Sequence, residues 1–228
     1  LNELLEPFFE WHREEELPKY ALIIENLELI LDEDIQLESI ESISNDVEQS
    51  WFQLEDRMLL WMVPMVRDLT NEQIAELLQS MQTKTSQSEN KYLNRNLQTY
   101  QNDNYKRLRK NLRRFIGGMN KDQLDLISNA SKEMIRVDNQ WINNRKALIE
   151  NLKIILKRGD GWELALKNIT HSDDKVSENY RKTYSHNIKI TQHLFVDILN
   201  SRTEKQDKKL REQLLRYRTD INKLAAQN

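Results

Sequence analysis

Residues that could bind a metal are few and scattered along the chain. His12 and Glu16 are four residues apart and could share one helix face, as could His186, His193 and Asp197. A protein metal site needs three or four converging ligands, so binding through His12 and Glu16 would need ligands from elsewhere, and the sequence has no dense His/Asp cluster. We therefore expect His12 to pack at a helix joint and the other histidines to be ordinary surface or semi-buried residues. We expect no cofactor and no bound metal.

Sequence motifs of catalytic and nucleotide-binding sites do not occur in this chain. There is no HExxH, GxGxxG, GxxxxGK[ST] or GxSxG pattern, and no strand pattern precedes Gly117-Gly118. The chain has no Cys, which excludes disulfides, thiolate metal ligands and a Cys nucleophile. We therefore do not expect an enzyme, although a helical bundle could assemble a catalytic site from scattered residues.

Charge is distributed unevenly along the sequence. Residues 1–60 contain 17 acidic and 3 basic residues, whereas the rest of the chain contains 20 acidic and 31 basic residues. Six basic residues lie within residues 105–114, a density that could bind phosphates or an anionic membrane. The same segment has an apolar face formed by Leu108, Leu112 and Phe115. We expect its basic face to be solvated, and the acidic N-terminal helices to pack along basic helices from residues 91–158.

Nucleic acid is not an expected partner of this chain. The pI is ≈ 5.9, and the sequence contains no groove-reading motif such as a zinc finger. If the charges pair internally, the protein should bind neither DNA nor anionic vesicles at physiological salt.

Apolar residues recur at helical spacing along most of the chain, and no useful segment alternates as a strand does. The longest row comprises Ile40, Ile43, Val47, Trp51, Leu54, Met58, Trp61 and Met65, which is close to a coiled-coil seam. Pro64 should kink or end this helix near Val63. Capping boxes at Thr70/Gln73 and Asn120/Gln123 should begin two further helices.

Other apolar rows predict the remaining helices. One helix covers Asn71–Ile116 if it is unbroken, and Gly117-Gly118 ends it. The next carries apolar residues from Leu124 to Leu156, a short helix spans Trp162–Ile169, and the last two carry Val176–Ile198 and Leu210–Leu224. We predict an all-α, elongated bundle of about five to seven helices, several of them long and coiled-coil-like. It should form a single domain, 1–228, with acidic helices in 1–66 and the remainder in 67–228.

One short segment resembles a known family. Trp11-His12-Arg13, Glu16-Leu17-Pro18 and Tyr20 match the WHRxxELPxY signature of a family of lipoproteins of unknown function from Gram-negative bacteria. The resemblance implies export to the periplasm, removal of a signal peptide, and a lipid anchor on a Cys upstream of Leu1. It supplies no catalytic residues. The signature residues Trp11, His12, Arg13, Glu16, Pro18 and Tyr20 are the candidate binding residues, with a packed helix joint as the alternative.

A second resemblance is confined to a shorter motif. Leu69-Thr70-x-x-Gln73 is similar to the LTxxQ motif of all-helical periplasmic stress chaperones, and Met119-Asn120-x-x-Gln123 is a degenerate copy. A capping box preceded by Leu has the same appearance. We therefore expect a non-catalytic envelope lipoprotein with a structural, protein-interaction or chaperone-like role and an envelope protein as a partner. The alternative is a protein that binds a small ligand or lipid in a cleft between helices.

Overall fold

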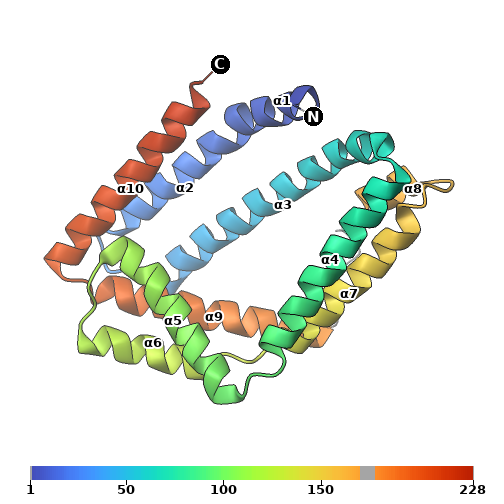
Figure 1. Cartoon of the computed structure of the whole chain (residues 1–228). Coiled ribbons are helices and arrows are strands. Elements are labelled where there is room, and N and C mark those ends of the chain that lie inside the picture. The colour runs from blue at the N-terminus through green and yellow to red at the C-terminus, as the bar shows by residue number, and fades with distance from the viewer. Residues whose placement is uncertain (1, 170–177, 228) are drawn as a thin grey trace. The chain divides into compact units, whose positions relative to one another are not determined.

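All regular secondary structure in the described part of the chain is helical. The computed structural model describes residues 2–169 and 178–227. The elements in order are α1 (Asn2–Trp11), the π-helix η1 (His12–Glu16), α2 (Leu17–Ile30), α3 (Leu37–Asp68), α4 (Asn71–Tyr92), α5 (Leu97–Ile116), α6 (Lys121–Glu133), α7 (Asp138–Ile155), α8 (Trp162–Lys167), α9 (Glu178–Asn200) and α10 (Glu204–Ala225) (Figure 1). The all-α prediction is confirmed, but the helices outnumber the predicted five to seven. Val176 lies outside the described residues.

The chain divides into two compact units, and each is described by itself. The α4–α7 unit comprises Leu1–Phe8, Glu55–Asn96 and Ile135–Ser185, and the α2–α10 unit comprises Phe9–Leu54, Leu97–Met134 and His186–Asn228. Helices α1, α3 and α9 contribute residues to both units. The predicted elongation and the predicted single domain stay predictions.

The α2–α10 unit has the larger apolar core. Its helices α2 and α10 lie side by side, and α5 packs on both α6 and α10 (Figure 1). The buried core residues are Leu31, Ile35, Ile40, Leu108, Leu112, Ile116, Ile127, Ala130, Met134, Leu194, Ile198, Leu210 and Leu214. Burial of these side chains supplies the main stabilisation of the unit, at about 25 cal/mol for each Å² removed from water.

The core of the α4–α7 unit is smaller. Helices α4 and α7 pack against each other, and α8 packs on α7 (Figure 1). The buried core residues are Val63, Val66, Ile74, Leu152, Leu156 and Leu166. Polar contacts supplement this core, because Lys146 and Arg145 of α7 reach Glu89 and Thr85 of α4 at 2.7 and 3.2 Å.

Both predicted capping boxes are present. The Thr70 hydroxyl accepts from the Gln73 N–H at the start of α4, and Asn120 and Gln123 form the same reciprocal pair at the start of α6. A third box, Thr203/Gln206, begins α10 and was not predicted. Each box pairs backbone N–H groups that a helix start leaves without intrahelical partners.

Two predicted helix boundaries differ from the structure. The segment Asn71–Ile116 is not one helix, because α4 ends at Tyr92 and α5 begins at Leu97. The prediction of one helix carrying Leu124 to Leu156 is wrong, because the backbone of Met134 is extended between α6 and α7. Arg136 lies in this interruption and donates to the Tyr92 and Arg95 carbonyls at 2.6 and 2.9 Å. These tertiary hydrogen bonds favour the interruption of the helix, although the apolar spacing continues through this point.

Helix α3 is longer than an end at Val63 would make it. It continues through Pro64 to Asp68, so Pro64 does not end the helix. The predicted coiled-coil character is not confirmed, because Val47, Trp51 and Met58 of the predicted seam are exposed. In the described residues, no helix is both long and apolar enough to span a membrane.

Candidate functional site

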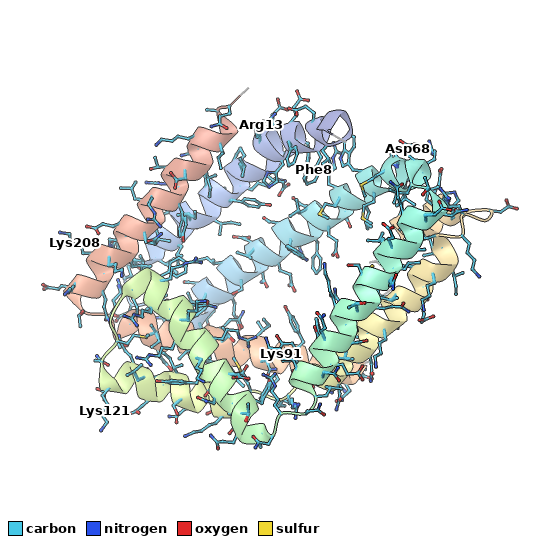
Figure 2. All side chains as sticks on the ribbon, viewed as in Figure 1. Phe8, Arg13, Asp68, Lys91, Lys121 and Lys208 are labelled. Atoms are coloured by element: carbon cyan, nitrogen blue, oxygen red, sulfur yellow. The ribbon has the colours of Figure 1, made fainter. Side chains whose placement is uncertain are left out.

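The signature segment forms a π-helical turn between α1 and α2, with Arg13 at the turn (Figure 2). Pro18 is at the N-terminal end of α2, where it has no N–H to donate and its ring would collide with the carbonyl four residues earlier. The Leu17 N–H donates to the His12 carbonyl, five residues back, which is the hydrogen bond of a π-helix. The wider turn thus lets one helical path continue through a proline.

The wider turn also places a carboxylate inside the protein. Glu16 is 0% exposed, and its Oε1 accepts a 2.7 Å hydrogen bond from Lys19 Nζ. Lys19 Nζ donates equally closely to Gln53 Oε1 on α3, also at 2.7 Å. The second carboxylate oxygen, Oε2, makes no hydrogen bond to any described residue. A buried polar atom without a partner is destabilising by about 1–3 kcal/mol, and such atoms are rare in folded proteins.

Three aromatic rings lie close to one another on this turn. His12 meets Tyr20 edge-on, with centroids 5.7 Å apart, and Trp11 lies 6.5 Å from His12. Burial lowers the pKa of His12 below its ordinary value, despite the opposing effect of the Glu16 charge. Burial and Glu16 together raise the pKa of Tyr20. Both shifts favour a neutral imidazole and a neutral phenol at pH 7.

The six candidate residues share one turn but differ in exposure. Glu16 is buried and Pro18 is exposed, while Trp11, His12, Arg13 and Tyr20 are half-buried. Their predicted binding role stays a prediction. Sequence reasoning missed Lys19 and Gln53, which connect the turn to α3. The three-residue spacing of Glu16 and Lys19 was an available signal, whereas nothing in the sequence indicated Gln53.

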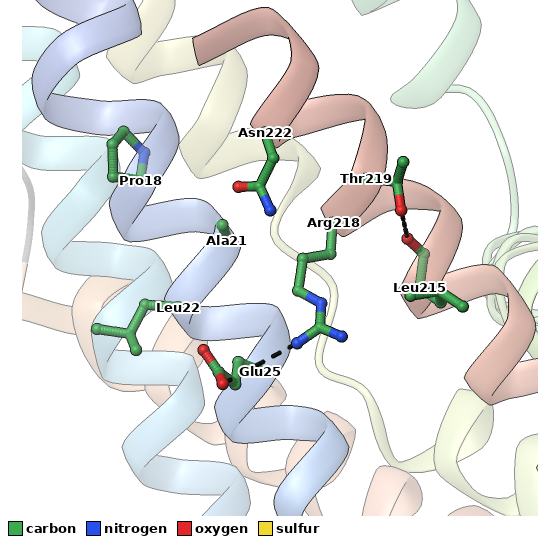
Figure 3. A pocket seen from close by; sticks show the side chains of 8 residues that line it. All are labelled: Pro18, Ala21, Leu22, Glu25, Leu215, Arg218, Thr219 and Asn222. Atoms are coloured by element: carbon green, nitrogen blue, oxygen red, sulfur yellow. Dashed lines mark hydrogen bonds and ion pairs between the residues drawn. The ribbon is translucent and has the colours of Figure 1, made fainter. Parts of the chain in front are cut away.

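An open groove lies between α2 and α10, close to this turn. It has a volume of ≈ 550 Å³ and is lined by Pro18, Ala21, Leu22, Glu25, Leu215, Arg218, Thr219 and Asn222 (Figure 3). Arg218 reaches across it, 4.0 Å from Glu25 and 3.1 Å from Glu28. The α2 wall is mainly apolar and the α10 wall mainly polar, so the groove suits an amphipathic ligand better than a fully apolar one.

The predicted metal-ligand candidates lie apart from this site. His186, His193 and Asp197 are all exposed on α9. In the described ranges, 2–169 and 178–227, no group of three or more potential ligands converges on one point.

The acidic N-terminal residues find a different partner from the predicted one. Helix α2 packs most extensively on α10 rather than on helices from residues 91–158. Arg218 of α10 pairs with Glu28, and Arg211 pairs with Asp32 at 2.9 Å. The Leu31 carbonyl also accepts from Arg211 and Arg202. The predicted internal charge pairing therefore occurs, but the cations come from the C-terminal helix.

An apolar patch is exposed on α3 where that helix belongs to the α2–α10 unit. Val47, Trp51 and Phe52 are 53%, 61% and 48% exposed. Val47 and Trp51 are neighbours on the helix surface because they are four residues apart, and Phe52 lies about 100° further around the helix. Gln53 follows Phe52 in the sequence and accepts from Lys19, but it lies roughly 160° around the helix from Trp51, so the signature turn contacts another face of α3. Single exposed apolar residues are common in proteins, whereas clustered ones mark interaction sites.

Comparison with known proteins assigns a family without an activity. The chain belongs to a family of unknown function (DUF6279), whose model matches residues 1–184. Neither a curated protein nor a solved structure matches the chain.

Proposed function

We propose that this chain is a non-catalytic envelope lipoprotein that binds exposed apolar segments of other envelope proteins, in an interaction or chaperone-like role. The apolar patch of Val47, Trp51 and Phe52 on α3 is the observation that carries the proposal. Transfer of the exposed part of one Trp side chain out of water is worth about 3 kcal/mol. The exposed parts of Val47, Trp51 and Phe52 together are enough for weak, reversible binding of a partner segment.

The signature turn has a positioning role in this proposal. Its Lys19–Gln53 hydrogen bond joins the start of α2 to a face of α3 that points away from Trp51, which leaves the patch exposed. The resemblance to the WHRxxELPxY lipoproteins supports a periplasmic location with a lipid anchor. The LTxxQ resemblance adds less support, because Thr70 and Gln73 already have a structural role as a capping box.

Suppression of aggregation tests the proposal directly. Light scattering would follow an unfolded outer-membrane protein diluted from urea, with and without the chain. We expect Val47→Lys combined with Trp51→Lys to abolish the suppression, because lysine removes the apolar contact without burying a charge at these exposed positions. Ile154→Lys combined with Leu164→Lys is the matched control, since these are exposed apolar residues on α7 and α8 and the added charge is the same. Equal activity of the parent and the double variant would refute the proposal.

The groove between α2 and α10 favours a second candidate, a protein that binds a small ligand or lipid. Its volume of ≈ 550 Å³ lies within the range of ligand sites. Native mass spectrometry of the purified chain distinguishes the two candidates. A lipid bound at one-to-one stoichiometry and lost on Leu22→Glu substitution would establish this candidate instead.

A further inference from the structure

Helix α5 exposes a row of cations on one face. The exposed residues are Lys106, Arg107, Arg109, Lys110, Arg113 and Arg114. At 3.6 residues per turn, the six occupy an arc of about 160° around the helix axis. The opposite face carries the buried Tyr100, Asn104, Leu108, Leu112 and Ile116. Core packing therefore fixes which face of α5 points outward, and that face is basic.

These cations are not used inside the protein. Within the described part of the chain, none of the six makes an ion pair, and Arg107 only donates to Asn104 of the same helix, at 3.1 Å. Two of the acidic residues that were expected to oppose them, Glu28 of α2 and Asp32 just after α2, pair with α10. The prediction of a basic face opposite the acidic N-terminal helices therefore loses its basis.

The helix dipole accounts for only part of the row. Arg113 and Arg114 are in the last turn of α5, where cations interact favourably with the free carbonyl groups. This effect falls off within one turn, so it does not extend to Lys106 or Lys110. Beyond the helix end, the side chain of Lys209 from α10 lies against Gly117. A Cβ added to Gly117 would be 3.1 Å from Lys209 Nζ. A cation from α10 thus continues the basic surface past the C-terminus of α5.

We propose that this basic face of α5 binds the anionic headgroups of a phospholipid bilayer. Clusters of four to eight Lys and Arg residues on one surface typically bind anionic lipids, with about 1 kcal/mol for each cation near the membrane. The exposed face carries no aromatic side chain for stacking on single-stranded bases, since Tyr105 and Phe115 pack on the core side. Helix α5 packs against α6 and α10. Its exposed face can therefore lie on a flat surface more easily than the helix can enter a DNA groove.

This inference deepens the proposed function, since a lipid-anchored protein lies close to a bilayer. It does not depend on the anchor or on α3, because the test uses the chain without lipid. The basic face would hold the α2–α10 unit at the membrane surface.

Vesicle co-sedimentation measures this binding. One set of vesicles contains phosphatidylcholine alone, and the other contains phosphatidylcholine with roughly one third phosphatidylglycerol, at low and at physiological salt. The test variant combines Lys106→Gln, Arg109→Gln, Lys110→Gln and Arg113→Gln. The control combines Lys84→Gln, Lys157→Gln, Lys167→Gln and Lys223→Gln, which are exposed outside α5 and give the same net charge.

We expect the parent chain and the control to bind only the anionic vesicles, and more weakly as salt rises. The test variant should bind several hundredfold more weakly, since each neutralised cation accounts for about fivefold. Circular dichroism should show both variants folded, because all eight side chains are exposed. Equal loss in both variants, or equal binding to both vesicle types, would overturn the inference. Tight binding of duplex DNA without vesicle binding would also overturn the inference. None of these outcomes tests the proposed role of the α3 patch.

Discussion

The glutamines of two capping boxes also bond to each other inside the α2–α10 unit, and removing one of them is the sharpest test of this fold. Gln123 Nε2 donates to Gln206 Oε1 at 3.1 Å, and Gln206 Nε2 donates back to Gln123 Oε1 at 2.9 Å. Gln123 is 0% exposed. Its amide also bonds the Ser201 carbonyl and the Asn120 N–H, at 3.1 and 3.2 Å.

Gln123→Ala would leave the buried amide of Gln206 without this partner. It would also remove the bonds to the Asn120 N–H and the Ser201 carbonyl, whose residues are exposed. Each buried unpaired group costs about 1–3 kcal/mol, and the lost side chain leaves a cavity in addition. We therefore expect the free energy of unfolding to fall by about 3–5 kcal/mol. Urea unfolding followed by circular dichroism would show a lower midpoint with an unchanged slope.

Gln73→Ala is the matched control for this substitution. Gln73 has the same position in the capping box of α4, but its side chain is exposed. We expect its loss to cost only about 0.5–1 kcal/mol, as for other exposed caps. If the two substitutions cost the same, the buried glutamine pair adds nothing to capping and the reasoning is wrong. A double-mutant cycle with Gln206→Ala should show a coupling of at least about 1 kcal/mol.

Three further predictions concern other polar groups. Arg136→Ala should destabilise the chain by about 3 kcal/mol in urea unfolding, because the Tyr92 carbonyl and the Asp138 carboxylate lose their 2.6 and 2.8 Å hydrogen bonds. Stability should fall as pH drops below about 6.5, since the lowered pKa of His12 lets the unfolded state bind a proton first. A His12→Gln variant that kept this dependence would exclude His12 as its source. Glu16→Leu should leave stability within about 1 kcal/mol of the parent but weaken aggregation suppression, and unchanged suppression would remove the turn from the proposed function.

Local sequence signals predicted two of the helix starts, those of α4 and α6. Thr70/Gln73 and Asn120/Gln123 are complete within four residues, so no distant contact is needed to form them. The end of α5 at Gly117 was predicted for the same reason, because glycine readily adopts the positive φ of 82° found there.

Features that depend on distant residues could not be predicted in this way. The interruption between α6 and α7 rests on hydrogen bonds from Arg136 to backbone carbonyls more than 40 residues earlier. Periodicity alone continues through this point. The apolar row of α3 likewise predicts a buried seam, whereas the exposure of Trp51 depends on which helices pack elsewhere. Spacing shows that a face is apolar, and only the fold shows whether anything covers it.

The signature turn combines a proline, a buried carboxylate and a lysine in a way that packing alone does not require. A leucine in place of Glu16 would fill the same interior without an oxygen that lacks a partner. What the carboxylate adds is the orientation of Lys19, whose ammonium group is shared between Glu16 and Gln53. That contact joins two helices which otherwise pack mainly on other elements. It does so on a face of α3 away from Trp51, so that Trp51 stays exposed, which favours a role in presenting the patch to a partner.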